Sequence, residues 1–216
     1  MKYALIISIL LWGLILSVAR AWAAPDYLLP IEPIRLNVVG ELGANGLSNL
    51  YHARMMRGAK AYLRTYGIRI KLGKLYKRMD PYPFYRSECN NLDCFEAEFS
   101  AKYYEYNELR RNGELLHVIA PPVMVDGHLY FAGMSLQCSV ANGAYSYSNA
   151  EKFNSAGDKR YRHSLNAMVH EILHTLGAQH DQSGPNIMHE AASKYVTGRL
   201  LPMNQKAIGE VLRCMK

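Results

Sequence analysis

The chain has 216 residues, with 25 basic and 18 acidic side chains and a formal net charge of +7 at pH 7. Half of the residues are hydrophobic, which excludes a disordered chain and is sufficient for a folded core. The positive excess is modest for this length, and the tyrosines between residues 76 and 106 fall partly on a predicted core stripe. We therefore expect no nucleic-acid partner.

The first 23 residues have the layout of a signal peptide. Lys2 supplies the positive charge of a short N-terminal region, residues 3–19 are almost wholly apolar, and residues 21–23 form an Ala-Trp-Ala cleavage pattern. An uncleaved transmembrane anchor is the alternative, because the apolar run is long for a signal peptide. The cleavage pattern favours removal. Both interpretations place a single domain, residues 24–216, outside the cytosol, and cleavage makes it a secreted extracellular or periplasmic protein.

Four cysteines, an even number, indicate two disulfide bonds in an exported chain. Four cysteines allow three pairings. We favour a small loop closed by Cys89–Cys94 and a second bond, Cys138–Cys214, that ties the C-terminal helix to the body of the domain.

The exported region opens with a predicted strand, helix and strand. Residues 35–39 have an apolar strand pattern, and Ser48 or Asn49 can cap a helix that runs to about Tyr66. Gly67 ends this helix, and apolar and basic side chains then alternate over residues 68–74, as in a half-buried strand. The predicted inward stripe of the helix consists of Met55, Met56, Ala59, Tyr62, Leu63 and Tyr66.

The middle of the chain predicts one more helix and three short strands. Apolar side chains between residues 95 and 109 follow helical spacing, and Asn112-Gly113 breaks this helix. Residues 115–120 form a short apolar run that two prolines stop. Residues 128–136 and 143–149 have the patterns of two further strands.

A helix with a clean apolar stripe follows, and Ser164 is its predicted cap. His170 and His174 lie four residues apart on it, so both imidazoles share one face and can bind one metal ion. Glu171 follows the first histidine, so its carboxylate can reach a water on that metal without being a ligand. The stripe consists of Leu165, Met168, Val169, Ile172, Leu173 and Leu176.

Gly177 and His180 extend this pattern. Glycine accepts the left-handed conformation that ends a helix, so Gly177 can turn the chain and return His180 as a third ligand. Three histidines leave a fourth position open for water, which is typical of catalytic zinc sites. A turn-rich run then ends at Met188, and a C-terminal helix is predicted from about Pro202.

These residues resemble the metzincin clan of zinc endopeptidases. The sequence His-Glu-x-x-His-x-x-Gly-x-x-His from His170 to His180, followed by Asp181 and Met188, is most similar to the adamalysin/reprolysin-like branch. The resemblance implies an α+β, zincin-like catalytic domain with a twisted mixed sheet and an active-site helix. It also implies a small C-terminal subdomain with a Met-turn and the C-terminal helix, and an edge strand over residues 131–136 that borders the cleft and pairs with a peptide substrate.

The resemblance further implies a zinc metalloendopeptidase with one catalytic Zn²⁺ on the three histidines. Glu171 would be the general base for a zinc-activated water. Met188 would form a hydrophobic floor, the Met-turn, and Asp181 would brace the turn through hydrogen bonds. The expected partner is a protein or peptide substrate of a monomeric enzyme, with membrane contact only if the N-terminal segment is retained.

Three alternatives stay open at this point. A narrow-specificity maturation protease would carry the same motif as a broad secreted protease. A non-catalytic metzincin-fold binding protein is disfavoured, because ligands, base and methionine are all intact. A cysteine thiolate that blocks the metal is also disfavoured, because Cys89 and Cys94 lie in no recognisable inhibitory motif. The remaining histidines that we expect to be ordinary packed or surface residues are His52, His117, His128 and His163.

Overall fold

A computed structural model covers the whole chain, and part of it is described here. The described residues are 33–41, 49–78, 94, 97, 101, 109, 113–120, 124–125, 128–129, 133–136, 144–149, 159–182, 186–189, 200, 204, 207 and 208. The predicted signal segment and most of the helix predicted between residues 95 and 109 lie outside this set. Among the described residues, no helix has both the length and the apolar character that crossing a membrane requires.

Cys94 is the one cysteine within the described part of the chain, and it is disulfide-bonded. Cys89, Cys138 and Cys214 lie outside the described residues. The two predicted pairings therefore stay predictions.

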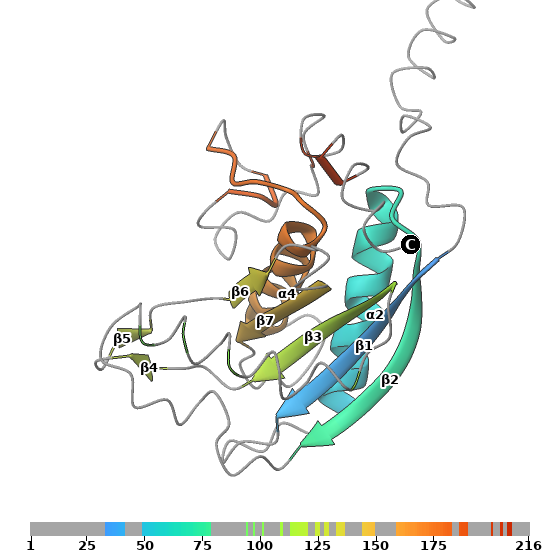
Figure 1. Ribbon diagram of the computed structural model, residues 1–216, viewed down its shortest axis with the longest axis vertical. Helices are drawn as coiled ribbons and strands as arrows, with labels where there is room; N and C mark the ends of the chain where they lie inside the picture. The colour runs from blue at the N-terminus through green and yellow to red at the C-terminus, as the bar shows by residue number, and fades with distance from the viewer. Residues whose placement is uncertain are drawn as a thin grey trace, which may run out of the picture.

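A five-stranded mixed sheet forms one layer of the molecule. Its strands are β1 (Ile34–Glu41), β2 (Ile70–Arg78), β3 (Glu114–Ala120), β6 (Gly133–Leu136) and β7 (Ala144–Asn149). They lie in the order β2-β1-β3-β7-β6, as Figure 1 shows. All neighbours are parallel except β6, which runs antiparallel to β7 at the edge of the sheet. The position of β6 agrees with the edge strand expected over residues 131–136.

One strand prediction is wrong. The single strand expected over residues 128–136 is divided into β5 (His128–Leu129) and β6. β5 pairs with β4 (Met124–Val125) in a separate antiparallel sheet, whereas β6 pairs with β7. An apolar pattern does not distinguish one long strand from two short strands with different partners, because pairing is decided by residues elsewhere in the chain.

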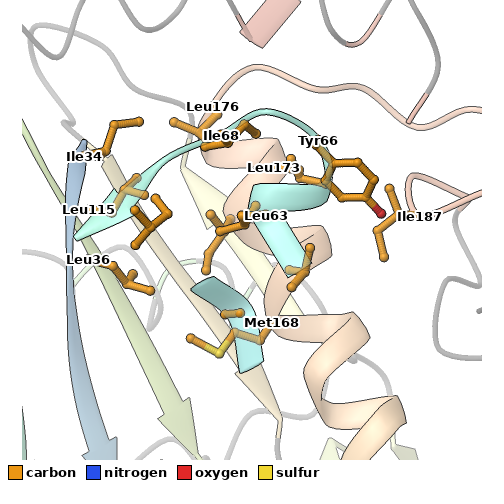
Figure 2. Packing of buried hydrophobic residues seen from close by; sticks show 14 of the residues in the cluster. Ile34, Leu36, Leu63, Tyr66, Ile68, Leu115, Met168, Leu173, Leu176 and Ile187 are labelled. Atoms are coloured by element: carbon orange, nitrogen blue, oxygen red, sulfur yellow. The ribbon is translucent and has the colours of Figure 1, made fainter. Parts of the chain in front are cut away.

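Two helices, α2 (Asn49–Thr65) and α4 (Lys159–Thr175), lie on the same side of the sheet (Figure 1). Alternate side chains of β1 and β3, such as Leu36 and Leu115, point toward them and pack in one buried cluster with both helices. Figure 2 shows Leu63 of α2 and Met168 of α4 in this cluster. The predicted apolar stripes of both helices are thereby confirmed, with Tyr62 and Leu165 only partly buried.

The predicted start of the active-site helix is wrong. The helix begins at Lys159, so Ser164 lies inside it with a buried side chain, and it does not cap the helix. The first turn contains no acidic residue, which is unfavourable for the helix dipole. Tyr161 and Leu165 pack against the core, and this packing stabilises the first turns of the helix.

Both helices end in the same glycine motif. Gly67 and Gly177 have φ angles of 79° and 98°, a left-handed conformation that glycine adopts without strain. The Ile68 N–H donates to the Leu63 carbonyl at 3.1 Å, and the Ala178 N–H donates to the Leu173 carbonyl at 3.0 Å. This pattern defines a Schellman cap and confirms the predicted helix ends.

Asn37 connects three strands on the face of the sheet opposite the helices. It lies at a register shift of β1 between Leu36 and Val38, and its side chain is buried. Its Nδ2 donates to Glu114 on β3 at 2.6 Å, and its Oδ1 accepts from the Lys74 N–H on β2 at 2.9 Å. One amide thus satisfies a donor and an acceptor where the regular strand pairing is interrupted.

Candidate metal centre

The structure brings the three predicted ligands together as a group that could hold a metal ion. The Nε2 atoms of His170 and His174 are 2.9 Å apart, and those of His170 and His180 are 3.2 Å apart. Nitrogen ligands about 2.0–2.1 Å from a tetrahedral zinc ion would be roughly 3.3 Å from each other. The three rings therefore converge at a spacing close to that of a zinc site.

Two backbone carbonyls set the tautomers of the helical histidines. His170 Nδ1 lies 2.6 Å from the Ile187 carbonyl oxygen, and His174 Nδ1 lies 2.7 Å from the Ala178 carbonyl oxygen. A carbonyl only accepts, so each Nδ1 carries the hydrogen and each neutral ring presents a lone pair at Nε2. Two such lone pairs facing one another repel, and a cation between them would remove that repulsion. The donor set therefore fits a zinc ion.

Burial keeps these two rings neutral. Desolvation, with a smaller contribution from the neighbouring imidazoles of His174 and His180, lowers the pKa of His170 to about 3, against the opposing effect of the Ile187 carbonyl. Desolvation likewise lowers the pKa of His174 to about 4. Both rings are therefore unprotonated at neutral pH, which is the form that binds a metal.

Glu171 lies beside the histidines with a buried side chain. Burial raises the pKa of its carboxyl to about 8, and a hydrogen bond with the Ser135 side chain on β6 acts in the opposite direction. A positive charge at the three histidines would also favour the ionised carboxylate. The site thus holds a carboxyl group whose pKa lies near neutral pH, as general acid–base catalysis requires.

A turn at residues 186–189 lies against His170 and the segment after His180. The Asp181 N–H donates to the Met188 carbonyl at 2.9 Å, and Asn186 Nδ2 donates to the Asp181 carbonyl at 3.1 Å. Asn186 Oδ1 also accepts from the Met188 N–H at 2.8 Å, and the Met188 side chain is buried. The backbone of Asp181 therefore makes the bracing hydrogen bonds that were expected of this residue.

Three residues of the site were not predicted from the sequence. They are Ser135, which contacts Glu171, Asn186 in the turn, and Asn204, which binds the backbone of Gln179. Asn186 follows a proline in a turn-rich run, which is a signal for a side chain that hydrogen-bonds its own turn. Ser135 and Asn204 have no such signal, because their partners are distant in the sequence.

Gly177→Ala is expected to destabilise the protein by about 1–2 kcal/mol and to weaken zinc binding, because an alanine does not readily adopt the left-handed conformation that directs the chain toward His180. Urea unfolding and a zinc competition titration would measure the two effects. Gly67→Ala is the matched control, since Gly67 ends α2 with the same motif and precedes no ligand. Equal zinc affinities of the two variants would contradict this role of Gly177.

Comparison with known proteins identifies the fold. No protein-family model and no curated protein sequence matches the chain. Archaemetzincin from Methanopyrus kandleri matches with a TM-score of 0.59 at 12% identity, over 85% of this chain and 98% of archaemetzincin. Metalloproteinase-II from Bacteroides fragilis gives 0.53 at 14% identity, over 85% of this chain and 55% of that protein. A zinc-dependent peptidase from Methanocorpusculum labreanum gives 0.53 at 10% identity, over 80% of this chain and 99% of that peptidase.

The fold is therefore that of the zincin-like metallopeptidases, with a largely parallel sheet and packed helices. The predicted α+β class is confirmed at this level. The narrower adamalysin/reprolysin-like assignment finds no support in these three structures, one of which is an archaemetzincin. A local motif of about twenty residues is similar in several branches, whereas the match in fold extends over most of the chain.

Proposed function

We propose that the protein is a zinc-dependent endopeptidase that acts on protein substrates outside the cytosol. The convergence of three imidazole nitrogens, two of them oriented by backbone carbonyls, carries this proposal. The zincin-like fold, shared with archaemetzincin and other peptidases, supports it. We further propose that residues 1–23 are a signal peptide and that the exported enzyme is a monomer.

His170, His174 and His180 would hold one zinc ion, which would supply Lewis-acid activation of water and of the scissile carbonyl. Glu171 accepts a proton from the attacking water and returns it to the leaving amine. Its burial beside β6 keeps bulk water from the carboxyl group, which also forms a hydrogen bond with the Ser135 side chain. Met188 in the 186–189 turn is proposed as the hydrophobic floor of the site, the Met-turn of the resemblance.

The edge strand β6 is the proposed substrate-binding element. β6 is the last strand of its sheet and is paired only with β7 in the described part of the chain. A peptide in extended conformation can add to such an edge through main-chain hydrogen bonds. These bonds recognise the peptide backbone and do not require a particular side chain. Ser135 lies on β6 and contacts Glu171, so a peptide bound along this strand runs beside the proposed base.

The test compares two histidines of the same helix. His174→Ala removes a proposed ligand, whereas His163→Ala removes an exposed imidazole of α4 and is the matched control. Zinc content per chain and cleavage of a proteome-derived peptide library would be measured for both variants and the unchanged protein. We expect His174→Ala to lose zinc and cleavage, and His163→Ala to retain both.

Zinc binding by a folded chain that cleaves no peptide would support a non-catalytic binding protein in place of an enzyme. A folded, unchanged chain without zinc affinity would overturn the proposed metal centre. Removal of zinc with a chelator should abolish cleavage, and addition of zinc should restore it, because the three histidines and Glu171 remain in place throughout.

A further inference from the structure

We propose that Asn204 is a positioning residue for His180, the third histidine of the metal centre. The inference rests on the proposed zinc site and assigns to Asn204 a role in metal affinity. Asn204 is far from the three histidines in the sequence, and its backbone is helical, as are those of Ala207 and Ile208. Its side chain is buried, with 2% of its surface exposed.

His180 requires external positioning, unlike the two other ligands. His170 and His174 belong to a rigid helix, and a carbonyl oxygen orients each ring through Nδ1. His180 lies beyond the helix end, and its side chain is exposed. Within the described residues, the polar and ring–ring contacts of its imidazole are with the other two histidines. The direction of the His180 side chain therefore depends on how its backbone is held.

Asn204 holds the residue immediately before His180 at two points. The Gln179 N–H donates to Asn204 Oδ1 at 2.9 Å, and Asn204 Nδ2 donates to the Gln179 carbonyl at 3.0 Å. One amide thus satisfies both backbone groups of Gln179 in the way that a neighbouring strand would. Because both bonds come from one side chain, they restrict rotation of the Gln179 backbone as well as its distance.

The residue after His180 is held in a similar way. Both backbone groups of Asp181 are bonded to the 186–189 turn, through the Met188 carbonyl and Asn186 Nδ2. His180 is therefore located between two residues whose N–H and C=O groups are both satisfied. The bonds to Gln179 connect the residue before His180 to Asn204, and Ile208, four residues after Asn204, is part of the buried core.

The two hydrogen bonds between Asn204 and Gln179 determine which substitutions test the proposal. Asn204→Asp keeps an oxygen acceptor for the Gln179 N–H and loses the donor for the Gln179 carbonyl. Asn204→Leu has a similar volume and loses both bonds. Asn37→Leu is the matched control, since Asn37 is also 2% exposed and makes two hydrogen bonds, on the opposite face of the sheet. Comparison with Asn37→Leu therefore distinguishes an effect of lower overall stability from an effect on the position of His180.

The zinc dissociation constant of each variant would be measured by competition with a chelator, together with the absorption spectrum of the cobalt-substituted protein. Partners that orient metal ligands typically change affinity by about 10–100-fold when removed, so we expect a loss in this range for Asn204→Leu. Asn204→Asp should give a smaller loss, and Asn37→Leu should bind zinc like the unchanged protein. The cobalt spectrum should change only in the Asn204 variants.

A second measurement does not depend on metal. Hydrogen exchange of the Gln179 amide in the zinc-free protein should be faster in Asn204→Leu than in Asn37→Leu, after correction for global stability, because leucine removes the acceptor of this N–H. Equal zinc affinities of Asn204→Leu, Asn37→Leu and the unchanged protein would overturn the positioning role and leave the proposed function intact. Absence of zinc binding by the unchanged protein would overturn both.

Discussion

Glu171→Gln is expected to lower kcat/KM by about 10²–10⁴-fold while leaving the zinc content of the protein unchanged. Glutamine has nearly the same shape and can still accept a hydrogen bond from Ser135, but it cannot take a proton from water. Glu171 is not one of the three converging ligands, so metal binding does not require its charge. Steady-state kinetics on a cleaved library peptide and zinc analysis of the same samples would measure the two effects.

Glu114→Gln is the control for this substitution. Glu114 is a carboxylate of β3 that pairs with Arg35 at 3.3 Å and accepts from Asn37, on the face of the sheet opposite the helices. Its conversion to an amide should leave kcat/KM within about twofold, since surface ion pairs contribute little to stability and this one is remote from the site. Undiminished activity of Glu171→Gln would show that another group accepts the proton.

His117 is expected to make the stability of the protein depend on pH. It is fully buried in β3, and its Nδ1 and Nε2 lie 2.7 and 2.8 Å from the hydroxyls of Ser146 and Ser148 on β7. Burial lowers the pKa of His117 from 6.5 to about 3. The unfolded chain therefore takes up a proton below pH 6.5 that the folded chain refuses, and the stabilising effect of neutral His117 is lost as pH falls from 6.5 toward 3.

The size of this pH effect follows from the linkage between protonation of His117 and folding. One such histidine changes the free energy of unfolding by about 1.4 kcal/mol per pH unit in this interval. Urea unfolding at about pH 7 and about pH 4.5 would compare the unchanged protein with His117→Gln. The variant should be less stable at the higher pH and should lose less stability on acidification, by roughly 2–3 kcal/mol.

The exposed His163 provides the matched substitution, and His163→Gln should not alter the pH dependence. All three proteins retain the same zinc ligands, so metal release at low pH cancels in the differences between them. His52 is a second buried histidine, with a pKa lowered by burial to about 4, and it should add to the remaining acid sensitivity. If the free energies of unfolding of the unchanged protein and His117→Gln changed equally with pH, the role of His117 would be refuted.

The convergence of the three histidines could be predicted from the sequence because their geometry is local. Residues four apart on a helix share a face, and this spacing alone places His170 beside His174. The φ angle of Gly177 is a property of one residue type, so the turn toward His180 was also predictable. The strands and helices with clear apolar periodicity were predicted for the same reason, within a few residues at their ends.

Contacts between distant segments were decided only by the tertiary structure. Ser135 reaches Glu171 because β6 pairs with β7 beneath α4, and Asn204 reaches Gln179 in a part of the chain where Ile208 packs in the core. The start of α4 at Lys159 similarly depends on the packing of Tyr161 and Leu165. Helical spacing and turn conformation are encoded in neighbouring residues, and this is why the convergence of His170, His174 and His180 could be predicted from the sequence alone. Ser135 and Glu171, and likewise Asn204 and Gln179, become neighbours only when the sheet and helices pack together.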